Sequence, residues 1–267
     1  MLGAIIGDIA GSRFERRAAR IKTTKFTFFH PDCHLTDDSV LTLAVAEALL
    51  LCKGDFNNLA KQAFITLRRW GQRYPACGFG SAFKTWLFKP EQEAKPYQSF
   101  GNGSAMRVSP CAWAAQNLEQ AKELASAVTC LTHDHPEGIK GAEAVAVAIY
   151  LAKSGKTQAA IKTYLQTHYY PLDFTLEEIR PGYSFSATCQ DSVPQALEAF
   201  CEAASFEDAV RLAISLGGDS DTQGAIAGSI AEAYFGIPPA LRQQALAYFY
   251  PEELPVLTAF EEQYGKK

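Results

Sequence analysis

Two short acidic segments, far apart in the chain, each stand next to apolar patterns with helical spacing. Residues 217–224 read Gly-Gly-Asp-Ser-Asp-Thr-Gln-Gly, and residues 36–39 read Thr-Asp-Asp-Ser. Apolar residues recur at helical spacing over 209–216, 225–234 and 40–51, which predicts buried helices that meet at partly shielded acidic corners. Unpaired carboxylates in such places are costly, so each corner indicates a bound cation.

The donor atoms of the two segments indicate which cations would suit them. They supply four carboxylates and two hydroxyls, from Asp37, Asp38, Asp219, Asp221, Thr36 and Thr222. Hard oxygen donors select Mg²⁺, Mn²⁺ or Ca²⁺ over zinc. Four carboxylates suit two divalent ions about 3.5–4 Å apart, an arrangement that holds oxygen substrates and activates water. For residues 217–224 taken alone, the alternative is a helix cap, because Asp and Thr are common at helix starts.

Three further polar positions could bind a ligand. Asp8 lies in an apolar helical pattern over residues 2–11, so it needs either a structural hydrogen bond or a site at the helix end. Residues 101–104 read Gly-Asn-Gly-Ser, and free backbone N–H groups in such a turn can hold a phosphate. The alternative is an ordinary capped turn. Arg107 could pair with an anion or a core carboxylate, and we favour the structural pairing.

Histidines are concentrated at one place, where His133 and His135 flank Asp134. A zinc site would need more ligands, and no cysteine stands at ligand spacing. Two interpretations remain, a structural histidine with its hydrogen bonds satisfied and a histidine that lies against a nucleotide. The charges of residues 13–17 are most simply those of a solvated loop.

The composition excludes several classes of protein. With 267 residues, 48% of them hydrophobic, and a formal net charge of −4, the chain lacks the basic character of general nucleic-acid binding. Its seven scattered cysteines argue for reduced thiols in a cytoplasmic protein and against a disulfide framework. The apolar start is short and lacks a basic leader, so we predict no secretion signal. No stretch approaches the roughly 18–20 apolar residues of a membrane helix.

Helical spacing dominates the chain from end to end. Further helices are predicted over residues 57–72, 118–131, 139–153, 157–167 and 193–204, with a short one that ends at Phe88. Residues 21–34 lack this period and are predicted to form an extended arm that leads to Thr36. Residues 89–99 and 168–190 read as polar connections. Because neither a linker nor a convincing run of alternating strands is present, we predict one all-α domain over residues 1–267.

Taken together, these segments resemble those of the ADP-ribosylglycohydrolase family, which includes the dinitrogenase reductase-activating glycohydrolases. Five motifs occur in the order found in the family: Gly7-Asp8-x-x-Gly11-Ser12-x-Phe14-Glu15, Thr36-Asp37-Asp38-Ser39, Gly101-Asn102-Gly103-Ser104-Ala105-Met106-Arg107, Thr132-His133-x-His135-Pro136 and Gly217-Gly218-Asp219-Ser220-Asp221-Thr222. Each motif is weak alone, whereas five in order over residues 7–236 are a strong signal.

The resemblance implies an orthogonal all-α bundle with a dimetal cleft that holds two Mg²⁺ or Mn²⁺ ions. It also implies hydrolysis of the glycosidic bond between ADP-ribose and a protein side chain or other acceptor. The implied metal ligands are Thr36, Asp37, Asp38, Asp219, Asp221 and Thr222. The implied catalytic residues are Glu15, Asp38 and Asp219, with Glu15 orienting water or handling the proton of the leaving group. Asp8 would be a partner of the metals or substrate. Ser99, Phe100, Gly101, Asn102, Gly103 and Ser104 would wrap the pyrophosphate and distal ribose, and His133 would contact the adenosine half.

One loop departs from the family pattern. Arginine-specific members carry an aspartate where residues 74–80 here read Tyr-Pro-Ala-Cys-Gly-Phe-Gly. This departure favours a serine-type or small-molecule acceptor. We therefore expect a monomer that acts on an ADP-ribosylated protein or a small ADP-ribose conjugate, with ADP-ribose as product. Two alternatives stay open: a catalytically silent ADP-ribose-binding protein, and a dimetal hydrolase of another nucleoside or sugar conjugate.

Overall fold

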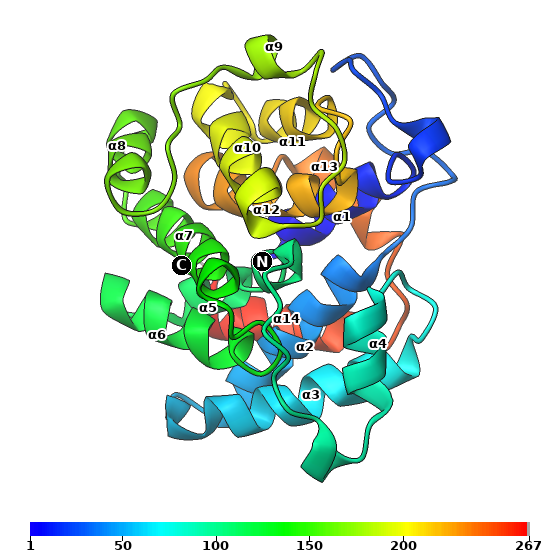
Figure 1. Ribbon diagram of the computed structural model, residues 1–267, viewed down its shortest axis with the longest axis vertical. Helices are drawn as coiled ribbons and strands as arrows, with labels where there is room; N and C mark the ends of the chain where they lie inside the picture. The colour runs from blue at the N-terminus through cyan, green and yellow to red at the C-terminus, as the bar shows by residue number, and fades with distance from the viewer. Residues whose placement is uncertain (266–267) are drawn as a thin grey trace.

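The computed structural model describes residues 1–265, and throughout that range the regular elements are helices (Figure 1). The α-helices are α1 Leu2–Ser12, α2 Asp37–Cys52, α3 Leu59–Arg73, α4 Ser81–Phe88, α5 Ser109–Ala114, α6 Leu118–Thr129, α7 Pro136–Lys153, α8 Gln158–His168, α9 Leu176–Ile179, α10 Cys189–Glu202, α11 Phe206–Ile214, α12 Ser220–Phe235, α13 Pro239–Leu246 and α14 Leu254–Tyr264. Short 3₁₀ turns are η1 Arg17–Ala19, η2 Phe56–Asn58, η3 Glu91–Glu93 and η4 Asn102–Ser104. The all-α prediction is confirmed.

Helices α1 and α12 form the centre of the arrangement. Figure 1 shows α1 against α12, with α10 and α11 to one side and α2, α3 and α14 to the other. Every residue of α1 is buried, as expected for a helix that is apolar on all sides. None of the helices within residues 1–265 is long and apolar enough to cross a lipid bilayer.

Glycines allow the backbones of α1 and α12 to touch. A Cβ atom placed on Gly7 would overlap the carbonyl oxygen of Gly224, and one placed on Gly3 would overlap that of Gly228. At Gly11 the same position is filled by the backbone of Ser220, at the start of α12. The contacts therefore run antiparallel, with one glycine per helical turn of α1. This packing brings Asp8 close to the acidic segment that begins α12.

The predicted helices are present, and their boundaries differ in ways that caps explain. Helix α7 begins at Pro136, three residues earlier than expected, because His135 caps it by accepting the N–H of Glu137 at 3.1 Å. Helix α10 begins at Cys189 instead of 193, with Thr188 as its cap. Helices α13 and α14 were not predicted, nor were the short helices α5 and α9, the second of which lies within the predicted polar connection 168–190. Both α13 and α14 have a proline in the first turn and only two buried residues, so the apolar period of each is weak.

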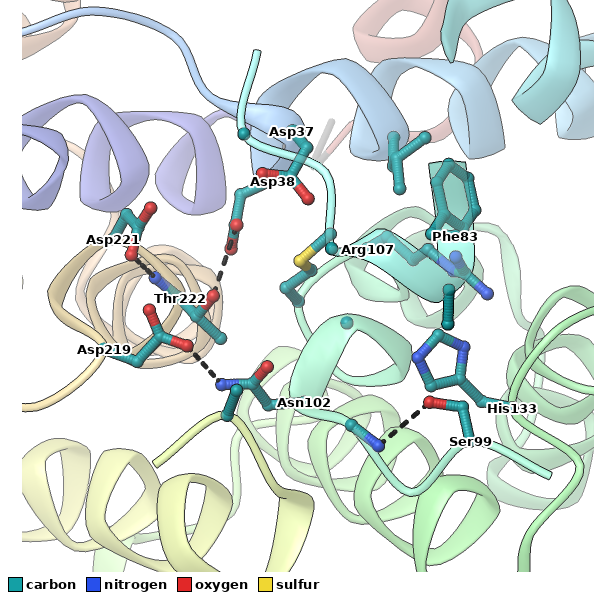
Figure 2. A pocket seen from close by; sticks show the side chains of 18 of the residues that line it. Asp37, Asp38, Phe83, Ser99, Asn102, Arg107, His133, Asp219, Asp221 and Thr222 are labelled. Carbon is teal, nitrogen blue, oxygen red and sulfur yellow. Dashed lines mark hydrogen bonds between the residues drawn. The ribbon is translucent and has the colours of Figure 1, made fainter. Parts of the chain in front are cut away.

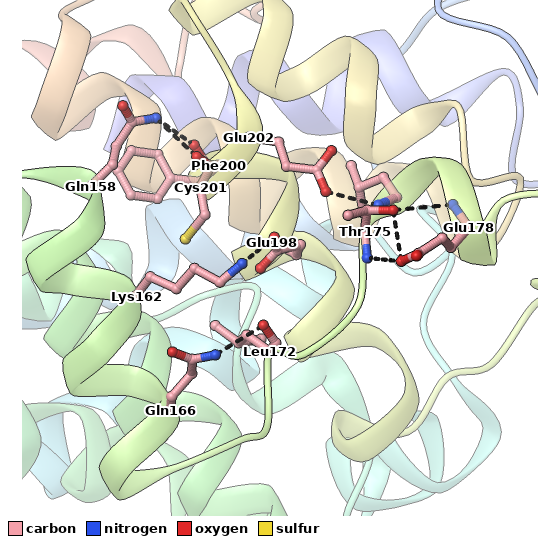
Figure 3. A network of polar contacts seen from close by, with 11 residues as sticks. Gln158, Lys162, Gln166, Leu172, Thr175, Glu178, Glu198, Phe200, Cys201 and Glu202 are labelled. Atoms are coloured by element: carbon pink, nitrogen blue, oxygen red, sulfur yellow. Dashed lines mark hydrogen bonds and ion pairs between the residues drawn. The ribbon is translucent and has the colours of Figure 1, made fainter.

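Hydrogen bonds and an ion pair hold the connection between α8 and α10 against the neighbouring helices (Figure 3). Lys162 on α8 forms an ion pair of 2.5 Å with the buried Glu198 on α10. The side chain of Gln166 donates to the carbonyl of Leu172 at 2.9 Å, and Glu202 accepts the N–H of Leu176 at 2.8 Å. These contacts fix the segment that passes on to residues 183–188, where it reaches the cleft described below.

Candidate active site

The two acidic corners meet in space. One carboxylate oxygen each from Asp8, Asp38 and Asp221 lie within 4.8 Å of one another, and so do oxygens from Glu15, Asp219 and Asp221. Asp221 belongs to both groups, so the two triads form one acidic cluster (Figure 2). The prediction that residues 36–39 and 217–224 come together is thus confirmed in its geometry.

Asp8 fixes the first corner through hydrogen bonds to the start of α2. Its carboxylate accepts the N–H of Thr36 at 3.0 Å, the hydroxyl of Thr36 at 2.6 Å and the N–H of Ser39 at 3.2 Å. The hydroxyl of Ser39 also donates to it. The Thr36 hydroxyl in turn accepts the N–H of Asp38 and caps the helix. Thr36 therefore caps α2 beside the cluster, whereas Asp219, at the corner where a cap was the alternative, makes no side-chain cap hydrogen bond to α12.

The second corner is oriented by contacts from three different segments. Asp219 accepts a hydrogen bond of 2.7 Å from the side-chain amide of Asn102. Thr222 donates to Asp38 at 3.2 Å, which links α12 directly to α2. Asp221 accepts the N–H of Thr222 at 3.0 Å. Each carboxylate is thus held in place by a neutral donor that leaves its charge uncompensated.

Burial and mutual repulsion raise the pKa values throughout the cluster. Burial, followed by the charge of Asp8, raises the pKa of Asp37 to about 8. Burial and neighbouring carboxylates hold the pKa values of Asp38 and Asp221 well above their ordinary range. Burial also raises the pKa of Glu15, with further contributions from Asp219 and Asp8. Such a concentration of perturbed carboxyls in a cleft marks a functional site.

The cluster has the properties of a divalent-cation site. Among residues 1–265, no lysine or arginine forms an ion pair with the clustered carboxylates. Oxygen Oδ1 of Asp38 is buried without a hydrogen-bond partner. Buried charge without a partner is strongly unfavourable, and the donors are all hard oxygens. The residues present therefore fit hard divalent cations, and Asp221 belongs to both groups of carboxylates that could hold one.

A cleft of about 360 Å³ extends away from the acidic cluster. Figure 2 shows acidic residues at one end, and Phe83, Arg107 and His133 at the other. The lining includes these residues predicted from the sequence: Glu15, Asp37, Asp38, Ser99, Gly101, Asn102, Gly103, His133, Asp219, Asp221 and Thr222. Asp8, which belongs to the cluster, and Thr36 are buried and do not line the cleft, Phe100 is exposed against His135, and Ser104 is buried beneath the turn.

The Gly-Asn-Gly-Ser turn differs from its expected role. The N–H of Gly101 donates to the Ser99 hydroxyl, that of Asn102 to the carbonyl of Ala187, and that of Ser104 to the carbonyl of Gly101. These three amides are therefore already used within the protein. Of the four residues in the turn, only Gly103 retains an N–H for which a bound phosphate would not have to displace one of these hydrogen bonds, so the expected cradle of free N–H groups is corrected for the other three.

The expected partner of Arg107 was also wrong. This fully buried side chain makes no ion pair with a carboxylate among the described residues, and its Nη2 donates to the hydroxyl of Thr132 at 2.7 Å. Nitrogens Nε and Nη1 have no hydrogen-bond partner.

Some lining residues were not anticipated from the sequence. Phe83 and Tyr97 form the wall around Arg107, and Phe185 stands at the rim, where the guanidinium of Arg20 lies 4.4 Å from its ring centroid. Phe83 lies on a short helix and the others on loops, so no periodic pattern marks them. Their place in the cleft follows from tertiary packing alone.

Comparisons with known proteins agree with this geometry. A family model described as ADP-ribosylglycohydrolase matches residues 1–264. The human ADP-ribosylhydrolase ARH3 is 25% identical over 338 residues, covering 96% of this chain and 90% of that protein. The chicken protein of the same name is 24% identical over 333 residues, with 93% and 88% covered. A solved structure described as an ADP-ribosylglycohydrolase-related protein complex has a similar fold, with a TM-score of 0.70, 24% identity, and coverage of 99% and 96%.

Proposed function

Because this chain belongs to the ADP-ribosylglycohydrolase family and is an ADP-ribosyl glycohydrolase, we propose that its hydrolysis of ADP-ribose conjugates depends on two divalent cations. The observation that supports the cations is the pair of carboxylate triads that share Asp221, are buried except for the half-buried Glu15, and form no ion pair with a lysine or arginine among residues 1–265. The position of the triads at one end of the cleft supports catalysis at that end.

Asp38, Asp219 and Asp221 would hold the cations, with Asp37, Thr36 and Thr222 completing the predicted ligand set. When bound, such ions would supply positive charge that binds the ribose hydroxyls and lowers the pKa of water. The carboxylates around them stabilise the oxocarbenium-like charge that develops on the sugar as the glycosidic bond breaks. Asn102 would keep Asp219 in its binding orientation through the amide hydrogen bond.

Glu15 would be the residue that transfers the proton. It is half-buried, lines the cleft, and stands within 4.8 Å of Asp219 and Asp221. Its raised pKa keeps a larger protonated fraction near neutral pH than an ordinary glutamate has, which suits a group that gives a proton to a leaving group. In its deprotonated form, the Glu15 carboxylate would orient the water that attacks the anomeric carbon.

Replacing Glu15 with glutamine should separate chemistry from binding. We expect kcat to fall by about 10²-fold, the lower range for loss of a general acid or base, because glutamine keeps the shape and loses the exchangeable proton. Affinity for ADP-ribose should change by less than about threefold, because the substitution removes an interaction made in the transition state and not one made in the bound ground state. The matched control is Glu177→Gln on the exposed start of α9. Unchanged kcat in Glu15→Gln would remove Glu15 from the mechanism.

The proposed function is tested by turnover of defined conjugates. Serine-linked and arginine-linked ADP-ribosyl peptides are incubated with the protein after treatment with a chelator, and again after Mg²⁺ is restored. We expect release of ADP-ribose only with the metal. Because residues 74–80 lack an acidic side chain to pair with a guanidinium, we expect the serine-linked peptide to be cleaved faster. Full activity in the presence of excess chelator would contradict the proposal.

A further inference from the structure

The segment that follows α1 is strongly basic. Residues 13–25 contain one acid, Glu15, and six cations, although the formal net charge of the whole chain is −4. None of these six cations forms an ion pair with a carboxylate among residues 1–265. Elsewhere in that range, cations on α3, α6, α7, α8, α11 and α13 do form ion pairs. The segment is therefore a local concentration of positive charge that the protein itself does not neutralise.

Packing holds this segment beside the second acidic corner. A Cβ atom on Gly217 would lie 2.7 Å from the carbonyl oxygen of Ile21 and 3.3 Å from Cε of Lys22. The amine of Lys22 donates a hydrogen bond to the carbonyl of Leu216. These contacts fix the segment against the chain only two or three residues before Asp219. Its charges therefore belong to the surroundings of the candidate active site.

Arg20 carries the positive charge to the rim of the cleft. Its guanidinium carbon lies 4.4 Å from the ring centroid of Phe185, which lines the cleft, and its Nε donates to the carbonyl of Glu15 at 3.2 Å. Burial raises the pKa of Asp219, and the charge of Arg20 opposes that rise. Arg20 thus stands close to the acidic corner, between the basic segment and the connection before α10.

Arg16 and Arg17 are exposed at the surface directly after Glu15. Burial raises the pKa of Glu15, and the charge of Arg16 acts against this rise, so the guanidinium is near the carboxyl group. Glu15 itself lines the cleft. The chain therefore passes within two residues from the inside of the cleft to a pair of exposed cations.

A cation from another part of the chain adds to this surface. Burial, followed by the charge of Arg180, lowers the pKa of Lys22, which shows that the two cations are near each other. The Nε of Arg180 donates to the hydroxyl of Ser215 at 3.0 Å, a neutral group that leaves the charge uncompensated. Like charges held together repel, and an anion would relieve the repulsion. We name the following five residues the basic rim: Arg16, Arg17, Arg20, Lys22 and Arg180.

The basic rim lies where an acceptor would leave the cleft. In the proposed mechanism Glu15 gives its proton to the leaving group, so the modified side chain of the acceptor ends beside Glu15. The rest of a protein acceptor must then continue over the surface around that residue, which begins with Arg16 and Arg17. Carboxylates near the modified side chain would supply the partners that the basic rim lacks within the protein.

A nucleic acid fits this surface less well than an acidic peptide. Its charge repeats along its whole length, so binding needs a basic surface that extends with it. The basic rim is a small patch on a chain with a net negative charge. A few carboxylates on either side of a modified residue need only the few cations that are present.

We propose that the basic rim binds acidic residues that flank the modified side chain of an ADP-ribosylated protein, so that the enzyme prefers acceptors in acidic stretches of sequence. This rests on the proposed function, which places the leaving group at Glu15. The basic rim selects among protein acceptors through their association with the enzyme and leaves the chemical step to the acidic cluster.

Peptides that differ only in their flanks test this preference. Three serine-linked ADP-ribosyl peptides carry glutamate, glutamine or lysine on both sides of the modified residue. At saturating Mg²⁺ and low ionic strength, we expect kcat/KM of the glutamate peptide to exceed that of the glutamine peptide by about three- to tenfold, the range for two exposed ion pairs. The lysine peptide should have the lowest value. The difference should lie in KM and shrink as salt is added, because salt screens exposed charges.

Removal of charge from the basic rim should abolish the preference. In the double variant Arg16→Gln/Arg17→Gln, we expect kcat/KM of the glutamate and glutamine peptides to agree within about twofold. The matched control is Lys61→Gln/Lys156→Gln, which removes the same charge from exposed positions on α3 and after α7, outside the cleft. The control should keep the wild-type ratio. Because each protein is judged by a ratio of two peptides, a general loss of activity does not imitate the expected result.

Three results would overturn the proposal. They are equal kcat/KM of the glutamate and glutamine peptides in the wild type, a wild-type ratio in Arg16→Gln/Arg17→Gln, and a higher kcat/KM for an ADP-ribosylated oligonucleotide than for the glutamate peptide. The last would assign the basic rim to a nucleic acid. Failure of the proposed function looks different, because the wild type would then release ADP-ribose from none of the peptides, and the basis for an acceptor preference would be lost with it.

Discussion

Replacing Asp38 with asparagine should lower turnover by about 10³-fold or more. Asparagine keeps the shape and can still accept the hydrogen bond from Thr222, but it removes the charge from an oxygen that has no other partner. A bound cation supplies several kcal/mol of transition-state stabilisation, and each 1.36 kcal/mol is about tenfold in rate. The measurement is release of ADP-ribose at saturating Mg²⁺. Asp173→Asn, on the exposed part of the connection before α9, is the control.

The same variant should change how stability depends on pH in the absence of metal. The folded-state pKa values of the clustered carboxyls are raised, so their contribution to stability is present at low pH and lost as pH rises through those values. For Asp37 that value is about 8. With chelator, the melting temperature of the wild type should fall between about pH 6.5 and about pH 8.5 more than that of Asp38→Asn, in which one repelling group is gone.

Adding Mg²⁺ should reverse this fall in the wild type only, because an ion that binds only the folded state stabilises it. Thiols that ionise in the unfolded chain affect both proteins equally, so the difference between them isolates the cluster. If wild type and Asp38→Asn showed parallel pH curves, and Mg²⁺ shifted neither, the cluster would not be a cation site.

A second large effect is expected from adding one methyl group at Gly7. In Gly7→Ala, the new Cβ would overlap the carbonyl group of Gly224, which is backbone and cannot rotate away. The two helices must then separate, so we expect destabilisation by about 3 kcal/mol, at the upper end for overpacking. For a protein of this size that corresponds to a fall of roughly 6–12 °C in melting temperature.

The control for this substitution is Gly182→Ala, where nothing lies within 4 Å of the added Cβ and the residue is exposed. Its melting temperature should match that of the wild type. Both proteins are compared by calorimetry with Mg²⁺ present, so that metal binding is saturated in each. A melting temperature of Gly7→Ala equal to that of Gly182→Ala would mean that α1 and α12 do not pack as closely as described.

The acidic cluster could be predicted because most of its carboxylates lie in two short contiguous segments of the sequence. Asp37–Asp38 and Asp219–Asp221 each place two carboxylates beside a helical apolar pattern, and buried charge demands a partner wherever the fold places it. The same reasoning located Asp8 as a polar residue in an apolar helix. It could not tell whether Asp8 faces the metals or the cap of α2, because that depends on which helix lies opposite.

The far end of the cleft was less predictable. The partner of Arg107 was expected to be a carboxylate, and it is the hydroxyl of Thr132, a residue that the motif contained and whose contact no spacing reveals. The Gly101–Ser104 turn was expected to offer free amides, yet the carbonyl of Ala187 and neighbouring groups accept the N–H of Gly101, Asn102 and Ser104. Contacts of this kind connect loops that are distant in sequence, so they follow from tertiary packing and not from local pattern.

The close pairing of α1 with α12 also has a consequence for how the protein is made. Helix α1 leaves the ribosome well before α12, its main packing partner, because most of the other helices lie between them in the sequence. Until then an apolar helix with no polar face remains uncovered, a state that invites aggregation and chaperone binding. Contacts between such distant segments also slow folding. The acidic cluster therefore cannot assemble in the nascent protein until α12 has been synthesised.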